Sequence, residues 1–178
     1  MTKIEIKKTT VSGFDDFYAL FKKSLLDGYF LYSPNSSSFI VDVDEPKKEL
    51  FNGISKGESR LFLAYIDSKA VGYLLTRKQY GGVAFGHWLA VDKAFRDKGV
   101  ASSLLSHWES DALKQGAHML NLYTTENDIY FYKKNGFSLA GSMPDAWFGV
   151  DHFLFYKTLR KSDEKVFLKD YLKKKGLE

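Results

Sequence analysis

The segment from Phe85 to Leu105 constrains the fold most, because it predicts a strand, a tight polar turn and a helix in immediate succession. Residues 85–91 are mostly apolar, and from Val100 onward apolar residues recur at helical spacing. Arg96, Lys98 and Gly99 lie where this helix begins. The first N–H groups of a helix have no partner within it and form the positive end of its dipole. The turn is therefore a candidate site for a phosphate group.

Two motifs in this region resemble those of a known family. Arg96-x-x-Gly99-x-Ala101 is similar to the Arg/Gln-x-x-Gly-x-Gly/Ala motif of the GNAT N-acetyltransferases, which bind the pyrophosphate of acetyl-CoA. Tyr132-x-x-x-Gly136-Phe137 resembles their Tyr-x-x-x-Gly-Phe signature, and the order of elements matches from about residue 4 to residue 159. The alternative is a tight turn that only exposes two solvated cations. The chain lacks the Gly-x-x-x-x-Gly-Lys-Ser/Thr and Gly-x-Gly-x-x-Gly patterns of other phosphate-binding loops.

The resemblance implies that acetyl-CoA is the co-substrate and that its pyrophosphate binds at the turn. The residues implied are Arg96, Asp97, Lys98, Gly99, Val100, Ala101 and Ser102. Gly99 would let the backbone approach the ligand closely, and the two cations would add charge-assisted contacts. Asp97 is unexpected there, because its carboxylate would repel a pyrophosphate, so we expect this side chain to point to solvent.

Length and composition favour one globular domain without a cysteine-based site. The chain has 178 residues, which suggests a single domain with a sizeable core, and 44% of them are hydrophobic. It has no cysteine, which excludes disulfides, thiolate metal sites and a cysteine nucleophile. No apolar run approaches the ~18 residues of a membrane-spanning helix, and the N-terminus lacks an apolar signal core. We therefore expect a cytoplasmic protein with no membrane partner.

The basic charge is confined to the C-terminal end. Residues 1–156 hold 18 basic and 18 acidic side chains, whereas residues 157–178 hold 8 basic and 4 acidic ones. We expect an acetyltransferase domain over 1–160 and a basic amphipathic helix or tail over 161–178. That helix should begin near Ser162, with its apolar stripe docked on the domain or on a second subunit of a homodimer. Nothing else in the chain supports nucleic-acid binding.

The periodicity predicts an α/β fold with a sheet of mixed, mostly antiparallel strands, flanked by about four helices plus the C-terminal helix. The expected helices cover 14–26, 46–55, 100–115 and 128–135, and residues 29–43 are expected to form a loop. The expected strands cover 4–7, 60–66, 70–79, 83–91, 119–123, 137–140 and 150–159. The family resemblance implies that the sheet is splayed in its middle and that acetyl-CoA inserts at the split.

Acetyl transfer from a thioester to an amine needs a proton donor for the leaving thiolate and an oxyanion donor. Tyr132 matches the family's general-acid tyrosine, and a phenol can donate to a thiolate whose thiol has a pKa near ~8.5. The alternative is that Tyr132 only packs in the core. The resemblance assigns the oxyanion and pantetheine contacts to backbone N–H groups of the splayed strand, at Leu89 or Val91. Strict alternation would place residues 85, 87, 89 and 91 on one face of that strand.

A base must also remove a proton from the acceptor, because an alkyl amine is charged at neutral pH. His87 lies on the strand leading to Val91, and histidine has an ordinary pKa of ~6.5, which suits a base at neutral pH. The alternative is that a lone histidine in an apolar strand is simply buried in the core. His152 in the last expected strand is a similar candidate, and Asp151 is a weaker one. The four histidines show no paired metal-ligand spacing, so we expect no metal. The family's CoA-contacting asparagine position is Thr125 here, and Asn127 lies two residues later, so both are candidates.

The family resemblance implies that two aromatic segments flank the acceptor side of the sheet, which makes them candidate walls of the acceptor pocket. One holds Tyr29 and Tyr32, and the other holds Asp145 and Trp147. Aromatic faces attract ammonium groups, and a carboxylate adds charge complementarity, although aromatics under long loops often just cover the core. We therefore expect an N-acetyltransferase acting on a small-molecule or peptide amine by direct attack in a ternary complex. The alternatives are a non-catalytic acyl-CoA-sensing module and an acyltransferase with another acyl-CoA or acceptor.

Overall fold

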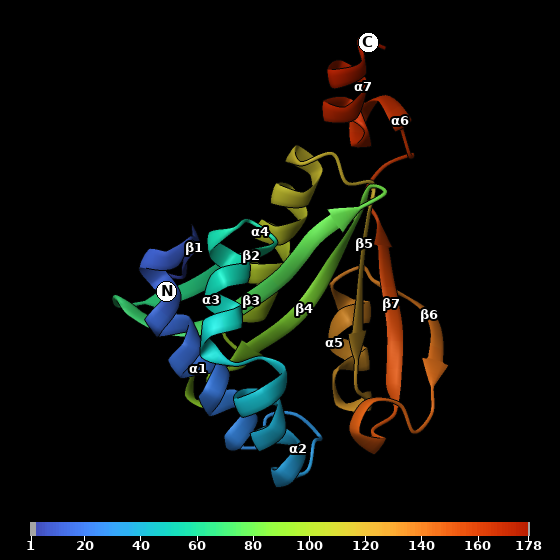
Figure 1. Ribbon diagram of the computed structural model, residues 1–178. Coiled ribbons are helices and arrows are strands. Elements are labelled where there is room, and N and C mark those ends of the chain that lie inside the picture. Colours follow the sequence, from blue (N-terminus) through green and yellow to red (C-terminus); the bar gives the residue numbers. More distant parts are fainter. Residues whose placement is uncertain (1–2, 178) are drawn as a thin grey trace.

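The computed structural model describes residues 3–177, which contain a seven-stranded sheet of order β1-β2-β3-β4-β5-β7-β6 (Figure 1). Neighbouring strands are antiparallel except β4 and β5, which are parallel. This confirms the expected α/β architecture. The strands are β1 (Glu5–Thr9), β2 (Ser59–Ile66), β3 (Lys69–Tyr80), β4 (Val83–Val91), β5 (Met119–Thr124), β6 (Ser138–Met143) and β7 (His152–Thr158).

Helices cover both faces of the sheet, so the hydrophobic core has two parts, one on each face. On one face, α1 (Phe14–Leu26) and α3 (Lys47–Ser55) pack on alternate residues of β2 and β3, among them Leu61, Leu63 and Tyr73. On the other face, α4 (Val100–Lys114) and α5 (Ile129–Lys134) pack with residues such as Phe62 and Leu74 (Figure 1). Successive side chains of β2 and β3 thus alternate between the two clusters, as expected for a sheet that is buried on both faces.

The segment expected as a loop at 29–43 is partly helical, so that prediction was wrong. It contains α2 (Pro34–Phe39) and a π-helical turn, η2 (Ile40–Asp44). Ser33 caps α2 by accepting a hydrogen bond from the Ser36 N–H at 3.2 Å, and Pro34 occupies the first helical position. Buried Ile40 and Val41 anchor the following turn in the core. The serine-rich composition predicted a loop, but the cap and the tertiary packing stabilise a helix there.

Strands β4 and β5 pair over only part of their length. Their parallel ladder joins Val83–Gly86 to Met119–Leu122 and stops there, although both strands continue. Beyond Gly86, β4 remains paired with β3 while β5 remains paired with β7. The two halves of the sheet therefore diverge from this point, which is the splay that the family resemblance implied.

A β-bulge at His87 overturns the strict alternation expected for β4. Leu75 pairs with Trp88 and Thr76 pairs with Gly86, so His87 is the extra residue. After the bulge, Trp88 packs with the α1 cluster while Leu89 and Val91 pack with the α4 cluster. One inserted residue reverses the direction of every side chain that follows it.

The C-terminal tail forms two short helices rather than one. They are α6 (Glu164–Phe167) and α7 (Lys169–Lys175), and Asp163 caps the first of them instead of Ser162. The Phe167 ring lies 5.7 Å from that of His118, so α6 contacts the turn before β5, whereas α7 extends away from the sheet (Figure 1). Within residues 3–177, no helix has the length and hydropathy needed to cross a lipid bilayer.

Candidate active site

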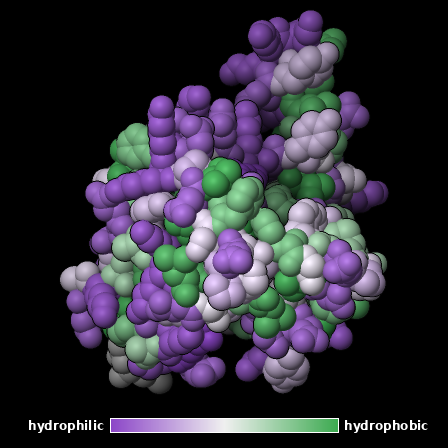
Figure 2. Space-filling model, turned by 60° about the horizontal axis from the view of Figure 1, so that its bottom comes forward, coloured by the Kyte–Doolittle hydropathy of each residue, from purple (hydrophilic) through white to green (hydrophobic). Residues whose placement is uncertain are grey.

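A cavity of about 360 Å³ opens where β4 and β5 diverge. Residues of both core clusters line it, so it passes through the sheet from one face to the other. From the α4 side come Leu74, Leu105, Leu122 and Tyr132, and from the α1 side come Phe30, Tyr32 and Trp88. Figure 2 views this end of the molecule and shows apolar residues gathered across the middle of the face, with hydrophilic residues around them. Two reactants could therefore meet inside the sheet from opposite faces.

The turn before α4 has the conformation that an anion cradle requires. Gly99 is the N-cap residue at φ +80°, and a Cβ built on it would meet no atom within 4 Å. The N–H groups of the first helical residues, Val100, Ala101 and Ser102, have no acceptor within the helix, and no side chain caps it. A side chain at position 99 would fill the space in front of these donors. Asp97 is exposed at φ +59°, in agreement with the expected orientation toward solvent.

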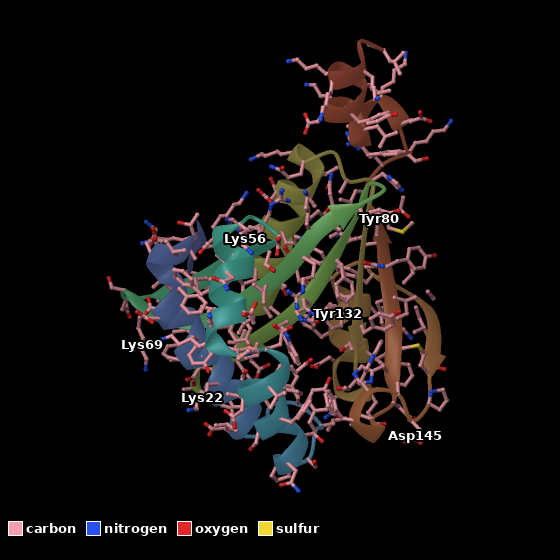
Figure 3. All side chains as sticks on the ribbon, viewed as in Figure 1. Lys22, Lys56, Lys69, Tyr80, Tyr132 and Asp145 are labelled. Atoms are coloured by element: carbon pink, nitrogen blue, oxygen red, sulfur yellow. The ribbon has the colours of Figure 1, made fainter. Side chains whose placement is uncertain are left out.

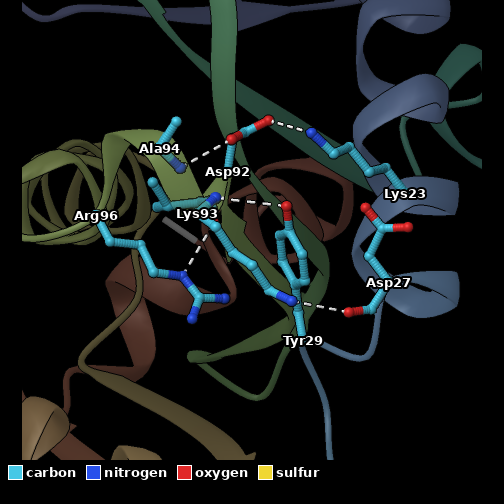
Figure 4. A network of polar contacts seen from close by, with 8 residues as sticks. Lys23, Asp27, Tyr29, Asp92, Lys93, Ala94 and Arg96 are labelled. Atoms are coloured by element: carbon cyan, nitrogen blue, oxygen red, sulfur yellow. Dashed lines mark hydrogen bonds and ion pairs between the residues drawn. The ribbon is translucent and has the colours of Figure 1, made fainter.

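The cations of the turn fold back onto the protein (Figure 4). Arg96 donates from Nε to the Val91 carbonyl at 3.3 Å, and its guanidinium lies 4.8 Å from the centre of the Tyr29 ring. Lys93 contacts the same ring at 4.8 Å, and Lys98 donates to the Ala94 carbonyl at 3.1 Å. The free N–H groups are thus the part of the turn that is preorganised for an anion, and the side chains would have to reorient to add their charge.

Backbone donors of β4 point into the gap between the separated strands. The Asp92 N–H donates to the Val71 carbonyl at 2.8 Å and so points toward β3. Because backbone groups alternate along a strand, the N–H groups of Leu89 and Val91 point the opposite way, toward β5. The β4–β5 ladder ends at Gly86, so it provides no acceptor for them. Leu89 lines the cavity, so its N–H is a potential donor there, and Val91 lies two residues further along the same strand.

Tyr132 projects from α5 into the cavity and is 7% exposed (Figure 3). Burial raises the pKa of its phenol far above the ordinary value, and the negative charge of Asp128 raises it further. Asp128 lies at the wall of the same cavity and remains in contact with solvent. Desolvation by the surrounding protein raises the pKa of its carboxyl, and the charge of Arg96 partly offsets this rise. The phenol is therefore protonated at neutral pH and can act as a donor but not as a base.

His87 lines the cavity from the α1 side and contacts an ion pair whose carboxylate, that of Glu45, is buried. Its Nε2 lies 2.5 Å from Oε1 of Glu45, and the same oxygen lies 2.5 Å from Nη2 of Arg77. Glu45 is 6% exposed. Burial alone would raise the pKa of this carboxyl, but the hydrogen bond and charge of His87 and the charge of Arg77 lower it. The carboxyl is therefore ionised next to the histidine.

Aromatic side chains enclose the α1 side of the cavity. The Tyr32 hydroxyl lies 3.2 Å from Nε2 of His152, whose Nδ1 lies 2.7 Å from the Val150 carbonyl. A carbonyl only accepts, so Nδ1 carries a proton and Nε2 of the neutral ring accepts from Tyr32. Trp147 packs edge-on against His152 at 5.0 Å and against Tyr123 at 4.9 Å. Burial raises the pKa of Tyr32 to about 12, so its phenol is protonated at neutral pH.

Apart from Val91 and the residues of the turn before α4, three of the candidate residues lie outside the cavity. Tyr29 packs under Lys93 and Arg96 in the turn before α4 (residues 93–99, the candidate phosphate turn), away from the aromatic wall. Asp145 lies at the turn after β6 (Figure 3), where its N–H donates to Asp151 Oδ1 at 2.8 Å. Of the two candidates for the CoA-contacting position, Thr125 lines the cavity and Asn127 does not. The cavity thus brings together Tyr132, His87, Leu89, Thr125, Tyr32 and Trp147.

A protein-family model for the acetyltransferase (GNAT) family matches residues 23–137, which span the phosphate turn, His87 and Tyr132. The chain belongs to the GNAT family. A comparison with curated protein sequences gave no match.

Solved GNAT structures share the fold at low sequence identity. PaiA N-acetyltransferase from Thermoplasma acidophilum, in complex with coenzyme A, is 22% identical with a TM-score of 0.75, over 88% of this chain and 99% of that one. Ard1 from Thermoplasma volcanium is 18% identical with a TM-score of 0.67, over 89% and 99%. An aminoglycoside 6'-acetyltransferase of type Ii is 18% identical with a TM-score of 0.68, over 89% and 99%. At these identities the likeness is one of fold.

Sequence reasoning about this GNAT chain missed four charged residues around the cavity. Glu45 and Arg77 contact His87, and Asp44 and Asp128 line the cavity walls. The acidic run directly before Pro46 was a visible signal, but only the π-helical turn brings it to β4. Arg77 and Asp128 stand out by no motif, since the sheet register and the short helical turn before α5 place them.

Proposed function

We propose that this GNAT protein transfers an acetyl group from acetyl-CoA to a primary amine of a small molecule or peptide, by direct attack in a ternary complex. The observation that carries the proposal is the cavity through the sheet, which has a protonated phenol on one side and a histidine on the other. An amine arriving from the α1 side would meet the thioester without a covalent enzyme intermediate. The chain supplies no cysteine for such an intermediate.

The residues at the start of α4 fit the pyrophosphate of acetyl-CoA. Val100, Ala101 and Ser102 would donate their N–H groups, and the open space beside Gly99 leaves room for the phosphates. Arg96 and Lys98 would add charge after swinging outward, and Thr125 would contact the arm of the co-substrate inside the cavity. The coenzyme A complex of the PaiA structure supports this choice of co-substrate. When bound, acetyl-CoA supplies the activated acyl group.

Tyr132, Leu89, Val91 and His87 would carry out the proton and charge transfers. His87 would take one proton from the acceptor ammonium, which frees the nitrogen lone pair for attack. The N–H groups of Leu89 and Val91 would stabilise negative charge that develops on the carbonyl oxygen. As the C–S bond breaks, Tyr132 would donate its proton to sulfur, and the second proton lost by nitrogen would restore the phenol through solvent.

The acceptor site would be the aromatic wall with Tyr32 and Trp147. An ammonium group over such rings gains about 0.5–2 kcal/mol. Asp44 lines the cavity on this side and supplies the carboxylate that we had expected from Asp145. We therefore propose a cationic acceptor whose nitrogen passes between the aromatic rings and a carboxylate.

Release of free thiol from acetyl-CoA with a panel of primary amines tests the proposal. Amine-dependent thiol release and a matching acetylated product are expected. Saturable binding of acetyl-CoA with no thiol release from any amine would instead identify an acyl-CoA-binding module. Release with alcohols but not with amines would assign a different acceptor class.

A further inference from the structure

The cluster behind His87 fixes where its ring proton lies. Glu45 Oε1 is 2.5 Å from both Arg77 Nη2 and His87 Nε2, and the two nitrogens are 2.9 Å apart. A carboxylate only accepts hydrogen bonds and a guanidinium only donates them. A bare Nε2 could accept from Arg77 at 2.9 Å, but it would then face the carboxylate oxygen lone pair against lone pair at the shorter distance of 2.5 Å. Nε2 therefore carries a proton, and both nitrogens donate to the same oxygen.

The other ring nitrogen of His87 is left free. Among residues 3–177, Nδ1 has no hydrogen-bond partner, and it is not among the buried polar atoms that lack one. It therefore keeps access to solvent on a side chain that lines the cavity. His152, the other histidine of the cavity, has no free lone pair, because its Nδ1 donates to Val150 and its Nε2 accepts from Tyr32.

We propose that Glu45 is a positioning residue that holds His87 in the Nε2–H tautomer, so that Nδ1 accepts the proton of the acceptor amine. This assignment rests on the proposed function for the source of the proton, but the tautomer itself does not. The N–H bond of the ammonium breaks, its electron pair stays on nitrogen, and the proton forms a new Nδ1–H bond. The carboxylate of Glu45 then offsets the charge of the imidazolium.

Arg77 has a separate part in this arrangement. Its guanidinium shares the Glu45 oxygen with His87, and its charge adds to the hydrogen bond and charge of His87 in lowering the pKa of the carboxyl against burial. An ionised Glu45 accepts the Nε2 proton but leaves it on the ring, as the carboxylate of a catalytic triad does for its histidine. The π-helical turn that ends at Asp44 delivers this carboxylate next to the β4 bulge.

The tautomer can be read by long-range ¹H–¹⁵N correlation spectra of the histidine rings in the protein without acetyl-CoA, at a pH where the rings are neutral. His87, assigned by its loss in His87→Gln, should show a protonated Nε2 and a bare Nδ1. His107 and His152 provide internal references, because each holds Nδ1 within 2.9 Å of a carbonyl and should show the opposite tautomer. A bare Nε2 in wild-type His87 would overturn the proposal, and the tautomer itself is read on the wild-type protein.

Glu45→Gln tests whether the positioning matters for turnover. It should populate both tautomers and lower kcat by roughly 10–10²-fold, as loss of a supporting carboxylate typically does, while the KM for acetyl-CoA is unchanged. Glu49→Gln, an exposed carboxylate on α3, is the matched control and should have wild-type kcat. Wild-type kcat in Glu45→Gln would overturn the role of Glu45. Absence of acetyl transfer in the wild-type protein would refute the proposed function and leave the tautomer result intact.

Discussion

Replacing Tyr132 by Phe removes one oxygen atom from the cavity and little else. The ring packs against Phe131, Phe137 and Phe155 with centroid distances of 5.1, 5.7 and 6.0 Å, and the phenylalanine ring retains all three contacts. Among residues 3–177, no hydrogen bond of the phenol oxygen is present to be lost. The free energy of unfolding should therefore change by less than about 1 kcal/mol, the net value of one hydrogen bond.

The effect on turnover should be much larger, because the variant has no proton to give to the leaving sulfur. Loss of a positioned general acid costs roughly 10²–10⁴ in rate. At about 1.36 kcal/mol per factor of ten, this corresponds to about 2.7–5.4 kcal/mol of activation free energy. The dissociation constant of acetyl-CoA should hardly change, since the shape of the cavity wall is kept.

The pH dependence follows from the raised pKa of the phenol. An acid works while it is protonated, that is, below its pKa in the folded protein. Burial and the charge of Asp128 hold the pKa of Tyr132 above the ordinary value near 10, so wild-type kcat should not fall between pH 7 and about 9.5 through loss of this proton. Tyr132→Phe should have lower kcat at every pH in that range.

Steady-state thiol release at saturating acetyl-CoA and amine measures the loss, and urea unfolding measures stability. Tyr130→Phe is the matched control, because this tyrosine lies on the same helix and is 77% exposed. It should retain wild-type kcat. Wild-type kcat in Tyr132→Phe would refute the reasoning and would make Tyr132 a packing residue, with water as the acid.

Three further changes test other parts of the site. Gly99→Val should raise the dissociation constant of acetyl-CoA at least tenfold in a binding titration, while Gly57→Val carries the same positive-φ strain in open space and should leave it unchanged. Trp147→Ala should raise the KM for the amine and spare that for acetyl-CoA, and Asp145→Ala, outside the cavity, should change neither. Asp92→Asn should lower stability at pH 7, by an amount that shrinks as the pH falls through the lowered pKa of Asp92 in the folded protein. Its pKa is lowered by a lysine partner, so its contribution is present above the unfolded value and is lost as pH falls.

Strong periodicity and turn chemistry made much of this fold predictable. The expected bounds of α1 (Phe14–Leu26) and β4 (Val83–Val91) coincide with the observed ones. Gly99 was expected to allow close backbone approach at the start of α4, and its φ of +80° is one that glycine adopts without strain. These features depend on neighbouring residues, which a single sequence displays directly.

The charged partners of the site depend on residues far apart in the chain. Glu45 and His87 are 42 residues apart, and their contact requires the sheet register, the bulge and the π-helical turn together. The aromatic segments raise a similar difficulty. Tyr29 and Tyr32 are three residues apart, yet one lies under the phosphate turn and the other on the cavity wall. Composition identified the segment, but only packing separates its members.

The two irregular elements at the cavity explain why the site escapes pattern reasoning. Without the bulge at His87, Leu89 and Val91 would direct their N–H groups at β3, and Trp88 would leave the acceptor side. The widened turn of η2 likewise determines which of the consecutive acidic residues is buried against β4 and which faces the cavity. Each element inserts one extra residue into an otherwise regular strand or helix, and the spacing of apolar residues in the sequence does not reveal it. The proposed catalytic groups therefore lie where the strand and helix periodicities both fail, and changes that restore regular pairing there should lower activity before they lower stability.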